Sequence, residues 1–426
     1  MKRLRYTIAL VTFAVCMAVS VAGSPPSLAT VGKQEQPRVR WRDRTIKIAI
    51  SSSLTTPNSN IKTDSDVRGA ITRSLQAWEA AADIKFQIET SDKQNVSPAS
   101  VGDGVSVITI AQSPENILFF GSDTQYVSAQ TRVFHGRRFI TEADIVLNPF
   151  QQFSTDGTFG TFDLQSTLTH EIGHLLGLKH SGVVGSVMSE KLAKVGALGF
   201  VEQGPRVLAE SDITAARDLY GLETDRDDCC ASVAGKLGVP VGRSFKNLRV
   251  WAEEGDSGKV LGHADVAGDG RFRIGGLPPG THKFYWKSRT ATNGSSAGEL
   301  GDIKVDKGET AVLNQKIAFG PSSLTLDFFG VNGQLGESGV LVESGREQMI
   351  YLGGKGLDSR TVEIEFSSPF IHAVSFTTVN QDFGEDVSVI SLYIIVDPQT
   401  PPGVYSIFAR GEDGSRAAVV GALKVN

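Results

Sequence analysis

The sequence predicts an α+β domain followed by two all-β sandwich domains. Helix and strand patterns mix from Trp41 to Leu222, whereas beyond Asp225 short alternating strands are separated by Gly, Asp and Pro turns almost throughout. The two kinds of sequence meet in the charged stretch LETDRDDCCAS, which has the composition of an exposed linker. The chain of 426 residues is also long enough for several domains of typical size.

The N-terminus has the pattern of a secretory signal peptide, assigned to residues 1–29. Lys2, Arg3 and Arg5 precede the apolar run YTIALVTFAVCMAVSVA, and small residues up to Ala29 offer cleavage sites. The alternative is a retained membrane anchor, but the run is shorter than the roughly 20 residues that span a bilayer. We therefore expect a secreted, extracellular protein without an integral membrane segment, with the periplasm as the alternative location.

Alternating apolar residues predict the strands of the first domain. In TIKIAIS, Ile46, Ile48 and Ile50 fall on one face of an extended chain. Further strands are expected at IKFQIE, GVSVITI, TRVFHG and ADIVLN. Together with the helices described next, they predict a mixed sheet covered by helices.

Two helices are expected to pack on this sheet. The first shows apolar residues at spacings of four, four and three, namely Val67, Ile71, Leu75 and Trp78. Ser65 or Asp64 is the predicted N-cap of this helix. The second helix is predicted to begin at an N-cap provided by Asp163 or Ser166.

Composition and cysteine content exclude some classes of protein. The hydrophobic share of 40% and the charged share of 21% are typical of globular proteins, and a net charge of -5 argues against a nucleic-acid partner. Past the signal peptide only Cys229 and Cys230 remain, so no disulfide framework holds the fold. A disulfide between these neighbours would be strained across a trans peptide, because their Cα atoms lie too close together. We therefore interpret the two cysteines as a structural or incidental pair. The alternatives are a redox role and inhibition of the zinc site.

The stretch THEIGHLLGLKHS concentrates three of the seven histidines within eleven residues. His170 and His174 are four residues apart and therefore project from one face of a helix, with Glu171 beside them. Gly177 can adopt the left-handed conformation that ends a helix, which would bring His180 back toward the pair. The spacing predicts a site of three nitrogen ligands with one open position.

This arrangement suits catalytic zinc. Catalytic zinc sites keep three protein ligands and leave the fourth position to water, whose pKa falls to about 7. Glu171 is then placed to act as the general base in the attack on a peptide carbonyl. The alternatives are core histidines that bind no metal and a structural metal site, but a structural site would usually have a fourth protein ligand, and none is apparent at motif spacing.

The stretch HEIGHLLGLKH matches the pattern H-E-x-x-H-x-x-G-x-x-H and so resembles the metzincin zinc proteases. A serine directly after the motif, here Ser181, resembles the pattern of the matrixin branch, which is the family of the matrix metalloproteinases. Met188 in GSVMSE lies eight residues past His180, where matrixins place the methionine of the Met-turn. The segments AITRSLQAWEAAADIKF and LAESDITAARDLYG also resemble matrixin helices, so the likeness covers residues 39–222.

The resemblance implies a metzincin fold and specific roles for five residues. It implies a mixed twisted sheet with the zinc site on the active-site helix. It also implies Zn2+ as the catalytic cofactor and a protein or peptide as the substrate. The residues concerned are His170, His174 and His180 as zinc ligands, Glu171 as the catalytic base and Met188 as a structural residue.

Several departures from the matrixin pattern limit what can be transferred. Ser189 and Glu190 replace the usual tyrosine and proline after Met188, and the long segment KLAKVGALGFVEQGPRVL follows, so pocket preference is not transferable. Only His135 is available for a second, structural zinc site, which is therefore not expected. Structural Ca2+ is left open without support from the sequence, and no propeptide cysteine is present to block the zinc.

The C-terminal half resembles two sandwich domains, assigned to residues 230–318 and 322–426. The segment GDGRFRIGGLPPGTHKF is similar to the carboxypeptidase regulatory-like domain, and TVEIEFSS, SVISLYIIVD and GVYSIFAR suggest an immunoglobulin-like sandwich. Trp251, Tyr285 and Trp286 either form a binding face or fill the core, and the core is favoured. No partner of the sandwiches can be named.

The sequence as a whole predicts a secreted zinc endopeptidase. One alternative is a secreted binding or adhesion protein whose metzincin domain is inactive. An intact Glu171 argues against it, because binding requires no base beside the metal. The other alternative is a zinc hydrolase that acts on a non-protein amide.

Overall fold

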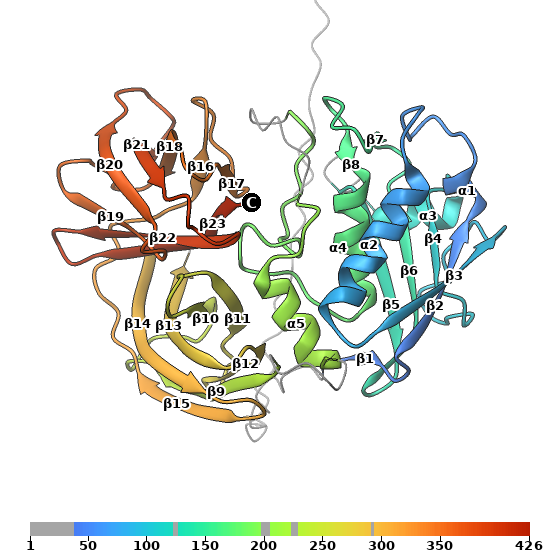
Figure 1. Ribbon diagram of the computed structural model, residues 1–426, viewed down its shortest axis with the longest axis horizontal. Helices are drawn as coiled ribbons and strands as arrows, with labels where there is room; N and C mark the ends of the chain where they lie inside the picture. The colour runs from blue at the N-terminus through green and yellow to red at the C-terminus, as the bar shows by residue number, and fades with distance from the viewer. Residues whose placement is uncertain (1–37, 122–126, 197–204, 223–228, 291–293) are drawn as a thin grey trace, which may run out of the picture.

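The computed structural model describes residues 38–121, 127–196, 205–222, 229–290 and 294–426. The predicted signal peptide, residues 1–29, lies outside these described residues. Figure 1 shows a helix-containing unit on one side and two units built of strands on the other, with helix α5 (Glu210–Tyr220) between them. Strands predominate over helices, as expected for one α+β unit followed by β units.

None of the helices in the described part of the chain combines the length and apolarity needed to cross a membrane.

The first unit contains all the helices that the structure describes and eight of its strands. The strands are β1 (Arg40–Trp41), β2 (Thr45–Ser51), β3 (Lys85–Ser91), β4 (Val107–Thr109), β5 (Ala129–His135), β6 (Phe139–Leu147), β7 (Phe153–Ser154) and β8 (Phe162–Asp163). The helices are α1 (Ser52–Thr55), α2 (Val67–Ala81), α3 (Pro114–Phe120), α4 (Leu164–Leu175) and α5. The five predicted strands correspond to β2 to β6, whereas the short elements β1, β7, β8, α1 and α3 were not predicted.

The main sheet is mixed, with the strand order β1-β6-β4-β2-β3 and β5 paired to β6. The pairs along this order are parallel, whereas β5 runs antiparallel to β6. Among the strands that the structure describes, β5 pairs with β6 alone, so its other edge is free of strand partners.

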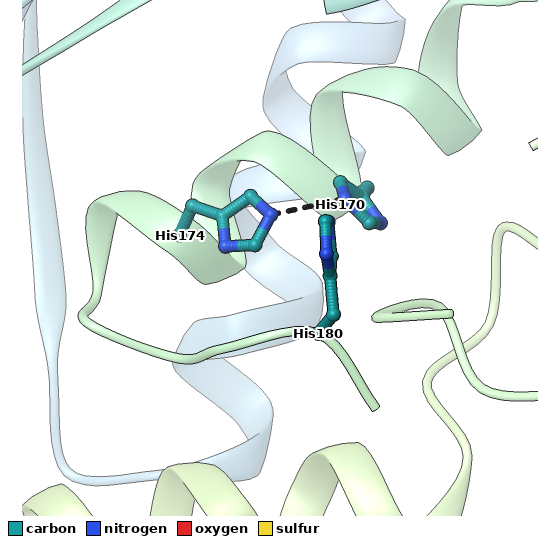
Figure 2. A group of neighbouring side chains, drawn as sticks. All are labelled: His170, His174 and His180. Carbon is teal, nitrogen blue, oxygen red and sulfur yellow. Dashed lines mark hydrogen bonds between the residues drawn. The ribbon is translucent and has the colours of Figure 1, made fainter. Parts of the chain in front are cut away.

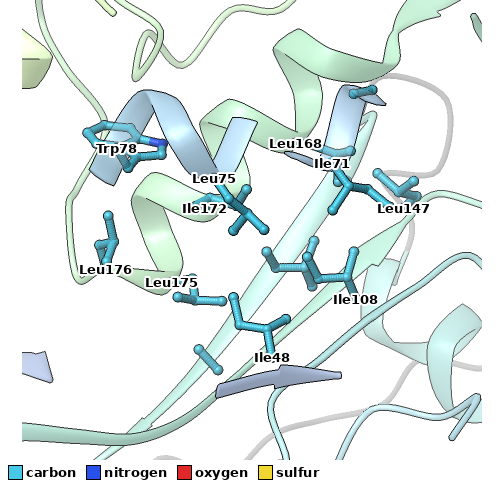
Figure 3. Packing of buried hydrophobic residues seen from close by; sticks show 14 of the residues in the cluster. Ile48, Ile71, Leu75, Trp78, Ile108, Leu147, Leu168, Ile172, Leu175 and Leu176 are labelled. Carbon is cyan, nitrogen blue, oxygen red and sulfur yellow. The ribbon is translucent and has the colours of Figure 1, made fainter. Parts of the chain in front are cut away.

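Helices α2 and α4 pack on one face of this sheet and on each other (Figure 3). Apolar residues of the sheet and of both helices form one buried cluster, which includes Ile48, Ile108, Leu147, Ile71, Leu75, Leu168, Ile172 and Leu175. Trp78 is fully buried, and its Nε1 donates a hydrogen bond to the Thr169 carbonyl at 2.9 Å. The predicted amphipathic helix is therefore confirmed, and it is fixed to α4 one residue before His170.

The N-cap of α2 differs from the prediction. Ser65 or Asp64 was expected, but the cap is Asp66, whose Oδ1 accepts a hydrogen bond from the Gly69 N–H at 2.9 Å. Asp64 has a φ of 73°, in the left-handed region. The chain is therefore still turning at Asp64, and the helix begins after Asp66 instead.

The remaining strands form four sheets in two sandwiches. The second unit pairs the sheets β11-β10-β13-β14 and β12-β9-β15, and the third pairs β16-β18-β21-β20 and β17-β23-β22-β19. Strands of the second unit are β9 (Ala231–Gly238), β10 (Leu248–Glu254), β11 (Val260–Asp265), β12 (Arg271–Leu277), β13 (Gly280–Thr290), β14 (Gly294–Val305) and β15 (Thr310–Lys316). Those of the third are β16 (Phe328–Gly330), β17 (Val340–Val342), β18 (Glu347–Gly354), β19 (Val362–Phe366), β20 (Ile371–Thr378), β21 (Ser388–Val396), β22 (Gly403–Gly411) and β23 (Arg416–Val425).

Cys229 and Cys230 lie where the second unit begins, after residues 223–228, which are outside the described part of the chain. The structure joins the two cysteines by a disulfide, and the peptide bond between them is cis. The interpretation of the two cysteines as a structural or incidental pair stays a prediction.

All three units meet in one apolar cluster, hereafter the junction. The junction contains Val183 and Ala209 of the first unit, Trp251 and Val260 of the second, and Val404, Ala418 and Val420 of the third. Trp251 is fully buried, and its ring stacks with those of Tyr285 and Phe408, whose centroids are 5.3 and 6.1 Å away. Burial confirms the interpretation of Trp251 and Trp286 as core residues.

We expect Trp251→Ala to destabilise the contact between the units. Removal of a buried tryptophan typically costs about 3–5 kcal/mol, and here it also removes the hydrogen bond that Trp251 Nε1 donates to Glu253 Oε1. Differential scanning calorimetry of the full chain should show a lower unfolding temperature. The matched control is Tyr393→Ala, because that side chain is 42% exposed. Equal shifts for the two variants would show that the junction does not stabilise the protein.

Candidate metal centre

Helix α4 presents two of the three motif histidines. Its N-cap is Asp163, one of the two predicted candidates, and the Asp163 carboxylate accepts a hydrogen bond from the Ser166 N–H at 2.7 Å. Arg206 donates to both oxygens of the same carboxylate, so the start of the helix is held from a second segment. His170 and His174 follow one helical turn apart on one face.

The helix ends as the sequence predicts. Gly177 has a φ of 95°, and its N–H donates to the His174 carbonyl at 2.9 Å. A Cβ at this position would also overlap the Val39 carbonyl oxygen, so glycine is needed for the close approach as well as for the turn. The chain then reverses and carries His180 back toward α4.

The three imidazoles converge as expected from the motif (Figure 2). One ring nitrogen from each of His170, His174 and His180 lies within 4.8 Å of the others, and Nε2 of His170 is 3.1 Å from Nε2 of His174. His170 is buried, His174 is partly buried and His180 is exposed. The group is therefore open on the side of His180.

Backbone carbonyls orient two of the rings. His170 Nδ1 lies 2.7 Å from the Val187 oxygen, and His174 Nδ1 lies 2.8 Å from the Leu178 oxygen. If each Nδ1 carries the proton that these contacts require, each Nε2 keeps a lone pair directed toward the other histidines. Such hydrogen bonds behind the ligating nitrogen are typical of metal-binding histidines.

His170 and His180 are held in the neutral form, which can bind a cation. Burial, followed by the nearby His174 ring, lowers the pKa of His170 to about 3. The same two causes lower the pKa of His180. Both rings are therefore neutral near pH 7, and a neutral imidazole offers a lone pair to a metal.

Glu171 lies beside the histidines and is buried. Its Oε2 accepts a hydrogen bond from the hydroxyl of Thr131 on β5, and burial raises the pKa of the carboxyl group. Sequence reasoning did not identify Thr131, because it lies 40 residues before Glu171 and belongs to no motif. Only the placement of the strand TRVFHG beside the helix could have indicated it.

Met188 packs directly against α4. It is 2% exposed, and a Cβ on Gly173 would overlap its Sδ and approach Trp78. Gly173 occupies a variable position of the motif, so nothing in the pattern singled it out. Because Gly173 has no side chain, Met188 can lie directly against the helix at this position.

The segment from Ser181 to Ser189 links the third histidine to Met188, and apart from isolated bridges it has no regular structure. Each of its nine backbone N–H groups nevertheless has a hydrogen-bond acceptor. Some acceptors lie within the segment itself: Ser181 N–H donates to the Met188 carbonyl, and Ser186 N–H donates to the Val183 carbonyl. The others come from α5 and from both sandwiches.

Asp212 on α5 provides one of these acceptors. Its carboxylate accepts hydrogen bonds from the N–H groups of Val187 at 2.9 Å and Met188 at 3.2 Å, and from the Ser186 hydroxyl. The Ala209 N–H donates to the same group at 2.9 Å. Burial raises the pKa of Asp212 and these hydrogen bonds oppose the rise. Sequence reasoning missed Asp212, although it lies in the stretch LAESDITAARDLYG.

The two sandwiches provide the remaining hydrogen-bond acceptors for the segment from Ser181 to Ser189. The Gly182 N–H donates to His263 Nε2 of β11 at 3.1 Å, while Val184 and Gly185 donate to the carbonyls of Val420 and Gly421 in β23 at 2.9 and 2.8 Å. Burial, and secondarily Arg249, lowers the pKa of His263 to about 3, so its ring is neutral and Nε2 can accept. Both sandwiches therefore fix the backbone between His180 and Met188.

A cleft of about 1560 Å³ surrounds the histidines. Its walls include β5 at residues 129–131 and 133, the histidines themselves, and α5. The second unit supplies a further wall, formed by the end of β11 and the turn after it, residues 262–268. The cleft is thus built by two units of the chain.

Comparison with known proteins matches the first unit to one family. Residues 40–221 match the model of the matrixin family. Metalloendoproteinase 1 of Glycine max is 26% identical over 199 residues, which cover 43% of this chain and 53% of that protein. The chain thus spans about half the length of this relative. It contains a matrixin-like domain, and both matches support a metalloprotease.

Solved structures give only distant similarity. The major pilin subunit BcpA of Bacillus cereus is 12% identical and aligns over 46% of this chain and 70% of that chain, with a TM-score of 0.18. SGBP-B of Bacteroides ovatus, solved in complex with a mixed-linkage heptasaccharide, is 15% identical over 45% and 42% of the two chains, with a TM-score of 0.16. At such TM-scores neither structure carries an argument about this chain.

We expect Asp212→Ala to weaken metal binding without changing any histidine. The variant leaves the N–H groups of Val187 and Ala209 without an acceptor, each at a cost of about 1–3 kcal/mol, whereas the Met188 N–H keeps the Ser186 hydroxyl oxygen as its acceptor. Because the Val187 carbonyl orients His170, zinc affinity should fall about tenfold or more in competition with a chromophoric chelator. Glu210→Ala removes a carboxylate from the same helical turn and should bind zinc like the unmodified chain. Unchanged affinity for Asp212→Ala would contradict this account.

The contact with β23 can be tested at a glycine. Gly421 has a φ of 68°, and a Cβ there would overlap a methyl group of Val183, so Gly421→Ala should displace the segment after His180 and lower zinc affinity about tenfold. Gly414→Ala is the matched control, because Gly414 has a φ of 83° but has no neighbouring atom within 4 Å of the place that a Cβ would take. A similar zinc affinity for both variants would show that β23 does not position the site.

Proposed function

Since the chain contains a matrixin-like domain in which three histidines converge, we propose that it is a secreted, zinc-dependent endopeptidase. The single observation that carries the proposal is the group formed by His170, His174 and His180 with the buried Glu171 beside it. Secretion is proposed on the N-terminal pattern of basic and apolar residues alone.

The donor set fits zinc. Imidazole nitrogens are ligands that zinc prefers, and the group formed by the described residues contains three members rather than the four typical of a structural site. His170, His174 and His180 are the proposed ligands, with Met188 supporting them from below α4. A bound zinc ion supplies Lewis acidity, which polarises a peptide carbonyl and makes water a nucleophile near neutral pH. Calcium is not part of the proposal.

Glu171 is the proposed general base. Its carboxylate accepts a proton from the attacking water and delivers it to the nitrogen of the departing amine. The Thr131 hydroxyl holds Oε2, which fixes the carboxylate relative to the cleft. Burial raises the pKa of Glu171 and so strengthens it as a base. The free edge of β5, which carries Thr131, lines the cleft where a substrate would lie.

The size of the cleft favours a polymeric substrate. Pockets for small molecules are typically about 300–1000 Å³, whereas this cleft measures about 1560 Å³ and is open. A protein or peptide therefore fits better than a small non-protein amide. The other alternative, a binding or adhesion protein with an inactive domain, does not explain a buried glutamate held by Thr131 beside the histidines.

The sandwiches are proposed to act through the catalytic unit. Their assignments as a carboxypeptidase regulatory-like domain at residues 230–318 and an immunoglobulin-like domain at 322–426 rest on sequence resemblance. Their contacts with Gly182, Val184 and Gly185 support a role in holding the metal centre. No partner molecule of the sandwiches is proposed on these contacts.

Cleavage of a mixed quenched-peptide library by the purified full chain tests the function. We expect cleavage to stop when a chelator removes zinc and to return when zinc is restored. Glu171→Gln should retain the same zinc content and lose activity by a factor of about 10² to 10⁴, because it cannot take up a proton.

The matched control is Glu115→Gln, which changes an exposed carboxylate on α3. It should cleave the library at the rate of the unmodified chain. A folded, zinc-loaded protein that cleaves no peptide, or a Glu171→Gln variant of full activity, would refute the proposal.

A further inference from the structure

A second cavity, of about 1150 Å³, lies where the second and third units meet. Five cationic side chains line it, namely Arg243, Lys246, Arg249, Lys287 and Arg289. Its lining includes two carboxylates, Asp265 and Asp327. This local excess of positive charge stands out in a chain whose net charge is -5.

Strand register places three of the cations close together. Arg249 on β10 pairs directly with Lys287 on β13, and Arg289 is two residues further along β13, on the same face. Side chains directly opposite one another on neighbouring antiparallel strands are about 4.5–5.5 Å apart at Cβ, and like charges there repel. A like-charged pair at such a position destabilises the sheet unless a negative charge compensates it.

The two carboxylates of the lining form ion pairs with the arginines but not with the lysine. Asp265 lies 2.8 Å from Arg249, and Asp327 lies 3.1 Å from Arg289. Among the described residues, no carboxylate lies within 4.0 Å of the Lys287 ammonium, and no hydrogen bond from it is formed. Burial, followed by the two arginines, lowers the pKa of Lys287 to about 7, and Asp327, the smallest of the four causes, opposes this shift.

We propose that this cavity binds a phosphate or sulfate group, held by Lys287 between Arg249 and Arg289. Such an oxyanion offers several acceptor oxygens, which suit the multiple N–H donors of guanidinium groups and the ammonium of lysine. It also adds negative charge beside Lys287, whose neighbours Arg249 and Arg289 are already paired with carboxylates. The site is distinct from the histidine centre and does not depend on the proposed protease activity.

The cavity has room for more than a free ion. A single phosphate or sulfate would occupy a small part of about 1150 Å³, so the group can be part of a larger molecule. Asp265, Val266 and Gly268 line both this cavity and the cleft around the histidines, which places the two side by side. Arg249 also packs against Gly182, two residues after His180. A bound oxyanion would therefore lie next to the segment that positions the metal centre.

Isothermal titration calorimetry of the full chain tests the site. Inorganic phosphate, inorganic sulfate and a sulfated disaccharide would each be titrated at constant ionic strength set by sodium chloride. We expect saturable binding of at least one probe to the unmodified chain. Tighter binding of the disaccharide than of free sulfate would indicate a group on a larger molecule, and equal binding would indicate the free ion.

Lys287→Met should weaken this binding at least tenfold. Because it removes a like charge beside Arg249, it should not lower the unfolding temperature in chloride. Lys316→Met, at an exposed lysine of the same sandwich, is the matched control and should bind as the unmodified chain does. Arg289→Gln is a second variant, and we expect it to weaken binding of the probes at least tenfold as well. It keeps the test decisive if Lys287→Met folds poorly.

Two results would overturn the proposal. One is that none of the three probes binds beyond what chloride alone produces. The other is that Lys287→Met and Arg289→Gln, both folded, bind the probes as tightly as the Lys316→Met control, which would indicate adventitious ion binding only.

Discussion

The candidate metal centre depends on an irregular segment, residues 181–189, whose backbone finds part of its hydrogen-bond acceptors outside itself. A backbone N–H left unpaired away from water costs as much as a lost hydrogen bond, so such a segment keeps one conformation only if its surroundings supply acceptors. Here they are supplied by the Asp212 carboxylate, by His263 and by the carbonyls of β23. His180 precedes the segment and the Val187 carbonyl within it orients His170, so the positions of two of the three histidines follow from these contacts.

This constraint explains why the sandwiches are more than appended units. Each contributes hydrogen bonds to the same segment, and the junction around Trp251 packs all three units together. The second unit also forms a wall of the cleft through residues 262–268. The residues of the first unit therefore form its helices, its sheet and its histidine group. The shape of the cleft, however, also depends on residues of the second and third units.

The sequence was most informative where the interactions are local. The histidine spacing, the Asp163 cap and the left-handed Gly177 are set by residues within a few positions of one another, and the structure places them as predicted. Predictions were less successful where distant residues decide the outcome. Thr131 and Asp212 carry no motif, and their importance follows only from which strand and which helix lie beside the centre.

The central claim is that three histidines and no fourth protein group hold the metal. The zinc K-edge X-ray absorption spectrum of the full chain, loaded with one equivalent of zinc, tests it most directly. The account predicts three imidazole nitrogens and one non-protein oxygen at about 2.0–2.1 Å. A fourth protein ligand would contradict it, as would sulfur at about 2.3 Å from Cys229 or Cys230.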